Sequence, residues 1–154
     1  MSEEIEGQLA SMDATRRSII QLIQDLDESA LNWNPLPGET NSIYAMVAHL
    51  CTSEQGMIHA GIGVLEVERL VENALQEAKG DNPQTLIDMI EKVGLQTREL
   101  LGTISNEKFG ELIERGTRRP RSAREWVHLH IRHMSDHLGH MEITKQFYEA
   151  GIVK

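Results

Sequence analysis

The hydrophobic positions of the chain recur with helical spacing over most of its length. In residues 5–27, positions three and four residues apart form one face of a predicted helix. Residues 32–38 contain two prolines, two asparagines and a glycine, and this composition predicts a loop. We expect a second helix after an N-cap at Asn41 or Ser42, extending to about Ile58. The face of the first helix contains Leu9, Met12, Arg16, Ile19, Ile20, Ile23 and Leu26.

The second half of the chain continues the helical pattern. Residues 64–78 are predicted to be helical, either as a separate helix or as a bent continuation of the preceding one. A third long helix is expected over residues 83–101, followed by a loop over residues 102–120. The last helix is predicted over residues 123–149, with Ser122 as its N-cap. Four main helices of this kind indicate an all-α fold, a four-helix bundle.

Length, charge and cysteine content limit the possible functions. The 154 residues fit a single domain spanning residues 1–154, large enough to bury a core without disulfides. The net charge of −9 argues against nonspecific binding to nucleic acid or to an anionic membrane. No apolar run approaches the ~20 residues of a membrane helix. Because Cys51 is the only cysteine and the N-terminus is acidic and polar, we expect a cytoplasmic protein.

Histidines are concentrated in the last predicted helix. Five of the seven in the chain lie between His128 and His140. At about 100° per residue, four of them fall within an arc of about 80°, on the side that carries Trp126 and Met141. This is the side that we expect to be buried. The four are His130, His133, His137 and His140.

Several neighbouring buried imidazoles need a common partner, and a metal ion is one such partner. His133 and His137 are four residues apart, so their rings project from successive turns and can converge on one cation. A third ligand would come from another helix, where His49 lies in a strongly apolar pattern whereas His59 lies beside glycines. A histidine at an apolar helix position is also commonly a hydrogen-bonded core residue, and that alternative remains open.

Two stretches of the sequence resemble the signatures of a known family, the DinB/YfiT-like superfamily of proposed metalloenzymes. In the first signature, a proline-glycine loop leads into a helix with a His-Leu pair, as in residues 31–42 followed by Ala48-His49-Leu50. The second combines a tryptophan near a helix start, His-x-x-x-His, glycine with a polar residue, and a glycine-terminated tail. The corresponding segments are residues 124–126, 133–137, 139–140 and 149–151.

The resemblance implies a four-helix bundle in up-down-down-up order, often dimeric, that holds one divalent ion. Carried over by position, the metal ligands are His49, His133 and His137. Many members of the superfamily have glutamine where this chain has His140. The resemblance therefore leaves three roles open for His140: support of a ligand, an alternative ligand, or a contact with substrate.

A three-histidine site determines the chemistry that we expect. Three protein ligands leave a position where water or a low-molecular-weight thiol can be activated. We therefore expect a divalent-metal-dependent hydrolase or a small-thiol-dependent transferase, acting on a small-molecule substrate as a homodimer. Imidazole ligands suit zinc or nickel, with iron as an alternative. The other function class is a non-catalytic metal- or ligand-binding stress-response protein.

The remaining candidate residues have simpler explanations. Cys51 lies about 200° around the helix from His49, so we interpret it as a packing residue. Trp33 is expected to seal one end of the bundle. Asp136 either orients a histidine or is a solvated carboxylate. A group of arginines either guides an anionic substrate or belongs to a solvated loop and helix start; it comprises Arg115, Arg118, Arg119, Arg121 and Arg124.

Overall fold

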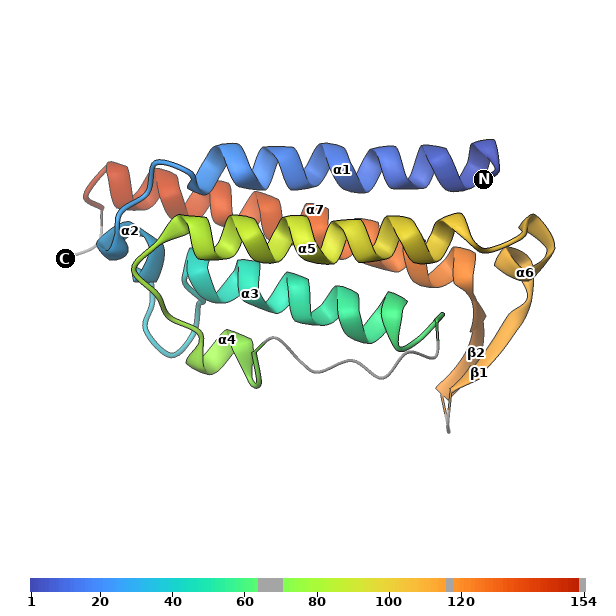
Figure 1. The fold of residues 1–154 in the computed structure, drawn as a ribbon. Coiled ribbons are helices and arrows are strands. Elements are labelled where there is room, and N and C mark those ends of the chain that lie inside the picture. Colours follow the sequence, from blue (N-terminus) through green and yellow to red (C-terminus); the bar gives the residue numbers. More distant parts are fainter. Residues whose placement is uncertain (64–70, 116–117, 153–154) are drawn as a thin grey trace.

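Four long helices lie side by side in the computed structural model, which describes residues 1–63, 71–115 and 118–152 (Figure 1). The all-α class predicted from the sequence is confirmed. The elements are α1 (Glu3–Ile23), α2 (Glu28–Asn32), α3 (Ile43–Glu54), the π-helical turn η1 (Gln55–His59), α4 (Ala74–Glu77), α5 (Pro83–Gly102), α6 (Asn106–Gly110), β1 (Leu112–Arg115), β2 (Arg118–Ser122) and α7 (Ala123–Glu149).

Each long helix packs against two others. α1 contacts α5 and α7, and α3 contacts the same two helices from the other side. In Figure 1, α1 and α7 run in one direction, and α3 and α5 run in the opposite direction. The chain ends lie at opposite ends of the bundle (Figure 1). α3 and α7 are therefore antiparallel neighbours, so residues near the middle of both helices can meet.

Side-chain caps fix where the helices begin. Ser42, rather than Asn41, caps α3, and its hydroxyl accepts a hydrogen bond from the backbone of Ala45. At α7, Ser122 and Glu125 form a capping box, in which each side chain binds the backbone of the other. At the other end of α7, Gly151 has a φ of 60°, which suits a glycine after a helix. The predicted boundaries of the last helix are confirmed.

A π-helical turn continues α3 without a break. In this turn the backbone N–H of Ala60 donates to the carbonyl of Gln55 at 2.9 Å, five residues earlier, in place of the usual four. Each such turn accommodates one extra residue. Glu54 and His59, five residues apart, therefore come closer to one face of the helix than regular α-helical spacing would allow.

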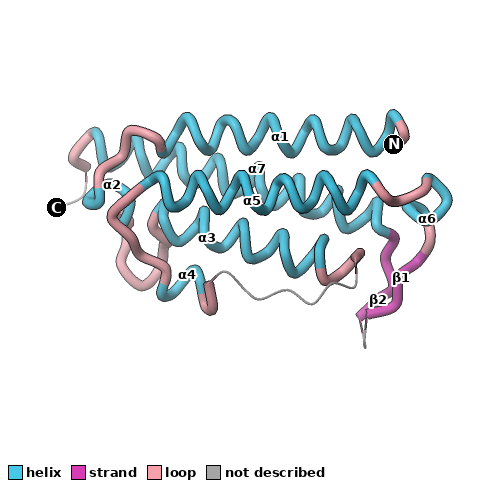
Figure 2. Tube along the Cα trace, in the orientation of Figure 1, coloured by secondary structure: helices cyan, strands magenta, loops and turns pink. Residues whose placement is uncertain are grey.

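Several short elements differ from the predictions. The first helix ends at Ile23, and Asp27 caps the short helix α2 in place of a continued α1. We find α6 and most of a two-stranded antiparallel hairpin in the predicted loop over residues 102–120. In this hairpin, shown in Figure 2, Leu112 pairs with Ser122. Of the predicted helical stretch 64–78, the described part contains only the single turn of α4, and residues 64–70 lie outside the described residues.

The core lies between the four long helices. All four contribute buried apolar side chains, and the short helix α6 adds Phe109, which is fully buried. Among the residues that the structure describes, no helix is both long enough and apolar enough to cross a membrane. The fully buried aliphatic and thioether side chains include Ile5, Leu9, Met12, Ile23, Leu31, Ile43, Ile58, Leu86, Leu101 and Met141.

Candidate metal centre

Three histidines converge between α3 and α7. The Nε2 atom of His133 lies 3.2 Å from Nε2 of His49 and 3.1 Å from Nε2 of His137. One ring nitrogen from each of the three lies within 4.8 Å of the others. All three side chains are half-buried. The structure therefore brings together the three residues that the sequence analysis selected as ligands, and this histidine triad is the candidate metal centre.

The triad is electrically neutral around pH 7. Burial, followed by the charges of His49 and His130, lowers the pKa of His133 to about 4. Burial, followed by His133 and His49, likewise lowers the pKa of His137 to about 4. The pKa of His49 is lowered by burial and then by His130. Neutral imidazoles carry a free ring lone pair, which is the form that binds a metal ion.

The Nδ1 atoms of His133 and His137 have different surroundings. Ser53 places its Oγ atom 3.4 Å from Nδ1 of His133, so this ring nitrogen can donate to the hydroxyl and leave Nε2 as an acceptor. In the described part of the chain, Nδ1 of His137 is buried with no hydrogen-bond partner. The orientation of the His133 ring is thus supported by a polar contact, whereas that of His137 depends on packing.

His140 lies outside the triad. Its side chain is exposed, and its ring stands perpendicular to that of His137 with the centroids 5.9 Å apart. Our expectation that all four histidines of the arc face the core is therefore wrong for His140, because the helices that pack against α7 leave this position uncovered. His130 is completely buried, and His133 and His137 lie between these extremes. Asp136 is exposed next to the triad, where its charge raises the pKa of both His133 and His137.

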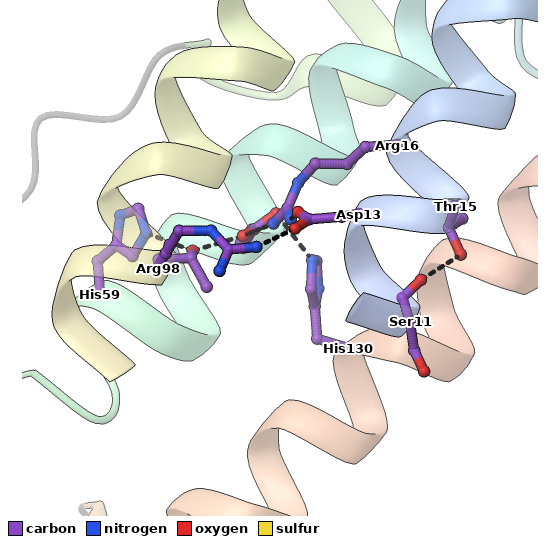
Figure 3. A network of polar contacts seen from close by, with 9 residues as sticks. Ser11, Asp13, Thr15, Arg16, His59, Arg98 and His130 are labelled. Atoms are coloured by element: carbon purple, nitrogen blue, oxygen red, sulfur yellow. Dashed lines mark hydrogen bonds and ion pairs between the residues drawn. The ribbon is translucent and has the colours of Figure 1, made fainter. Parts of the chain in front are cut away.

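A second polar group is buried beside the triad and is centred on Glu54. We call it the Glu54 network. One carboxylate oxygen accepts from Arg16 and from the hydroxyl of Thr97, and the other lies 3.2 Å from Nε2 of His130. Thr97 also lies 2.8 Å from Nε2 of His59. In Figure 3, Arg16 extends inward from α1 while His130 points toward the same centre from α7.

The partners of Glu54 keep its carboxylate ionised inside the core. Burial alone would raise the pKa of Glu54, but the hydrogen bond and charge of His130 oppose this effect, as do Arg16 and Thr97. The net result is a pKa of about 2. A buried charge with several donors is stable where an isolated one is not. Glu54 is 4% exposed, so the network is part of the core.

A glycine makes room for the arginine of the network. A Cβ atom at Gly94 of α5 would lie 2.9 Å from Nε of Arg16, closer than real Cβ contacts. Arg16 can thus lie against the α5 backbone and reach Glu54 on α3. Its other Nη atom donates to Asp13 at 2.8 Å, and Asp13 in turn pairs with Arg98 on the surface (Figure 3).

Other residues singled out in the sequence lie away from the triad. Cys51 is buried, and burial raises the pKa of its thiol to about 12, consistent with a packing role. Trp33 packs edge-on against Tyr148, with the ring centroids 5.7 Å apart. Arg119 pairs with Glu125, and Arg121 lies over the ring of Trp126. Each of these two arginines thus has a partner within the chain.

The sequence analysis missed the residues of the Glu54 network. His59 was set aside because glycines flank it, yet it is 1% exposed and bonded to Thr97. Two signals were present in the sequence. Arg16 falls on the apolar face of the first helix, and Glu54 follows Leu50 by one turn on the apolar face of the second. A charged residue at such a position indicates a buried partner of opposite charge.

Comparisons with known proteins place these features in a family. The model of the DinB superfamily matches residues 11–141, a stretch that includes the whole triad and the Glu54 network. A conserved protein from Enterococcus faecalis has a similar structure, with a TM-score of 0.76, 14% identity, and coverage of 95% of this chain and 96% of that one. A DinB-like protein from Bacillus cereus has a TM-score of 0.74 and 21% identity, covering 95% and 92%. No curated protein matches the sequence.

Proposed function

Because the chain belongs to the DinB superfamily, we propose that it is a metal-dependent enzyme whose divalent ion is held by His49, His133 and His137. The main support is the convergence of ring nitrogens, 3.2 Å between His49 and His133 and 3.1 Å between His133 and His137. Nitrogens bound about 2.0–2.1 Å from a tetrahedral ion lie about 3.3–3.4 Å from one another. Two of the three nitrogen pairs are therefore close to the spacing of such an ion, and all three nitrogens lie within 4.8 Å of one another.

The donor type limits the choice of metal. Three neutral imidazoles suit zinc, nickel, iron or copper, of which we expect zinc or nickel with iron as the alternative, and they do not suit magnesium or calcium, which prefer oxygen ligands. The lowered pKa values of His133 and His137 keep both rings unprotonated well below neutral pH. Protons therefore do not compete with the ion for these nitrogens under ordinary conditions.

The reaction that we propose is hydrolysis of a small molecule or transfer of a low-molecular-weight thiol. The bound ion would supply Lewis acidity to water or to the thiol. Ser53 accepts the Nδ1 proton of His133 and so keeps its Nε2 lone pair directed at the ion. His140 stands exposed beside His137, where it can contact a substrate that approaches from solvent.

The number of donors favours an enzyme over a non-catalytic metal-binding protein. Three histidines lie near enough to one another to share an ion. Among the described residues, this group includes no cysteine and no acidic side chain. His140 is not part of that group, although it is the residue that would close the site as a fourth ligand. Three protein ligands with an open position are typical of catalytic sites, and four are typical of structural ones.

Metal analysis of alanine variants tests the ligand set. The purified wild-type protein, reconstituted with zinc or nickel and desalted, is expected to retain about one ion per chain by mass spectrometry. His49→Ala, His133→Ala and His137→Ala should each lose most of the metal. His128→Ala is the matched control, because His128 is exposed on the same helix, and it should keep the metal. Normal metal content in both His133→Ala and His137→Ala would refute the proposal.

His140→Ala separates an enzyme from a binding protein. We expect this variant to keep its metal but to change turnover in a screen of esters, amides and thiol acceptors. In cobalt-substituted wild-type protein, the visible spectrum should change with pH near neutrality, because solvent occupies an open position. A cobalt spectrum typical of four protein ligands, with no change between pH 5 and 9, would instead favour the non-catalytic class.

The proposed homodimer stays a prediction. Half of the apolar stretch on which it rests, residues 62–75, lies outside the described residues.

A further inference from the structure

α3 and α7 contact each other through polar side chains at successive levels along the bundle. At the first level, His49 of α3 meets His133 and His137 of α7. Next, Ser53 of α3 reaches His133. At the third level, Glu54 of α3 meets His130 of α7 at 3.2 Å, one helical turn before His133. The same two helices thus carry the candidate metal centre and a buried hydrogen bond close to it.

The third level is fixed by more than these two helices. Arg16 from α1 and Thr97 from α5 hold the other oxygen of Glu54, so that all four long helices meet at this carboxylate. The side chains of Glu54 and Arg16 are 5% and 8% exposed, and that of His130 is fully buried. A charged group held from several sides in the core has few alternative positions, because moving it would leave a charge without a partner.

We propose that the Glu54–His130 hydrogen bond sets the register between α3 and α7 and thereby positions His49 against His133 and His137. This inference rests on the proposed function of the triad. Residues on a helix rise by 1.5 Å each, so fixing Glu54 against His130 also fixes His49 against His133. Metal–ligand distances tolerate shifts of only about 0.2 Å. A slip of a fraction of a residue between the two helices would therefore weaken metal binding.

Apolar packing alone specifies this register less sharply. The core around the network consists of aliphatic and methionine side chains, including Val47, Leu50 and Met134, which adapt to small displacements. A buried polar pair differs because it is satisfied in one arrangement only. Setting the register of packed helices is the best-attested use of such pairs. Glu54 and His130 are thus positioning residues, and neither is part of the ligand set.

Substitutions of His130 test the proposal. His130→Leu fills the same space without the hydrogen bond to Glu54, whereas His130→Gln places an amide donor near the position of Nε2. The control Thr97→Val removes a bond of the same network on the α5 side and leaves the α3–α7 contact intact. Each variant is titrated with cobalt(II) as the probe. Each metal-free variant is also examined by NMR of the imidazole nitrogens of His49, His133 and His137.

We expect His130→Leu to bind cobalt about tenfold more weakly than the wild type, and His130→Gln to regain most of the affinity. In the metal-free proteins, His130→Leu should shift the nitrogen signals of all three triad residues, whereas Thr97→Val, which leaves Arg16 and His130 on the carboxylate, should change the signals and the affinity less. Wild-type affinity and signals in His130→Leu would overturn the proposal. An equal loss of affinity in Thr97→Val would also overturn it, because metal binding would then follow general stability.

If the proposed metal site does not exist, the same experiment gives a different result. If the wild-type protein binds no cobalt, the ligand assignment is wrong, and the NMR signals of the metal-free variants alone decide the role of Glu54 and His130.

Discussion

The histidine triad and the Glu54 network both use helices α3 and α7, yet their histidines have opposite surroundings. In the triad, the converging nitrogens of His133 and His137 face one another and His49, and among the described residues the group that could share an ion with them contains no carboxylate. In the network, His130 faces Glu54, and His59 faces Thr97, at 3.2 and 2.8 Å. The triad is half-buried, and His59 and His130 are fully buried.

The difference shows how the partner of a histidine distinguishes a ligand from a structural residue. In the network, one ring nitrogen of each histidine has an oxygen partner within the protein, whereas Nδ1 of His130 is buried without a partner in the described part of the chain. Each neutral ring has one N–H and one lone pair, and where Nδ1 carries the proton, as the contact of His133 with Ser53 allows, Nε2 is an acceptor. With all three rings in this form, the Nε2 lone pairs would face one another with no proton between them, and a cation could bind all three. Position on an apolar helix face is shared by both groups, so position alone does not separate them.

Removing the charge at the centre of the network should have the largest effect on stability. Glu54→Ala removes the buried carboxylate partner of Arg16 and leaves it only Asp13, and we expect a loss of about 3–5 kcal/mol in the free energy of unfolding. Urea denaturation followed by circular dichroism measures this loss. Glu99→Ala, an exposed glutamate on α5, is the control and should change stability by about 0.5 kcal/mol or less. Equal stability of the two variants would mean that the network does not stabilise the fold.

Lowering the pH should destabilise the folded protein in two separate ranges, one caused by the triad and one by Glu54. In metal-free protein, the folded pKa of His133 and His137 is about 4 against an ordinary value of 6.5, so the unfolded chain binds more protons between these values. The triad therefore lowers stability as pH falls from 6.5 to about 4. Glu54 has a folded pKa of about 2 against 4.5, so its contribution is lost as pH falls from 4.5 to about 2.

Variants of the triad and of Glu54 show which group causes the loss of stability in each pH range. We expect His133→Gln combined with His137→Gln to flatten the stability profile between pH 6.5 and 4, and Glu54→Gln to flatten it below pH 4.5. Denaturant titrations at each pH, in the presence of a chelator, provide the profiles. An unchanged upper range in the double variant would contradict the assignment of that range to the triad.

The smallest effect is expected at Ser53, which touches the triad without belonging to it. Ser53→Ala removes the hydroxyl 3.4 Å from Nδ1 of His133, and the contact is long for a hydrogen bond. We therefore expect metal affinity to fall by about tenfold, the lower end of the range for such supporting residues. Isothermal titration with zinc measures it. Ser135→Ala on α7, where the hydroxyl bonds its own helix, is the matched control. A full loss of binding in Ser53→Ala would make Ser53 a ligand.

The triad could be predicted because its signal is local and periodic. His133 and His137 are one turn apart on a helix with clear boundaries, and His49 lies within the strongest apolar pattern of the chain. Helical spacing determines which side chains share a face, and a long amphipathic pattern determines which face is buried. The same reasoning placed His140 on the buried side, and it is exposed. Periodicity defines the direction of a side chain but not the point at which a neighbouring helix stops covering it.

The Glu54 network could not be assembled from periodicity because it joins residues from four long helices and a π-turn. Arg16, Glu54 and Thr97 are far apart in the sequence, and their meeting depends on how the helices pack. The hairpin formed by β1 and β2 was missed for a related reason. Its strands are short and rich in charged residues, so neither shows the alternating pattern of a half-buried strand.

The π-turn after Glu54 makes the length of this segment matter as much as its composition. Its i→i+5 bonding accommodates one residue more than an α-helix would need. Deleting a residue within η1 (Gln55–His59) would allow ordinary helical bonding, which is favourable for the backbone. The same deletion would leave Glu54 and His59 four residues apart, which is the α-helical spacing for one face. In this segment, an alignment gap of one position would thus mark a change from π-helical to α-helical bonding, and the contact of His59 with Thr97 could remain.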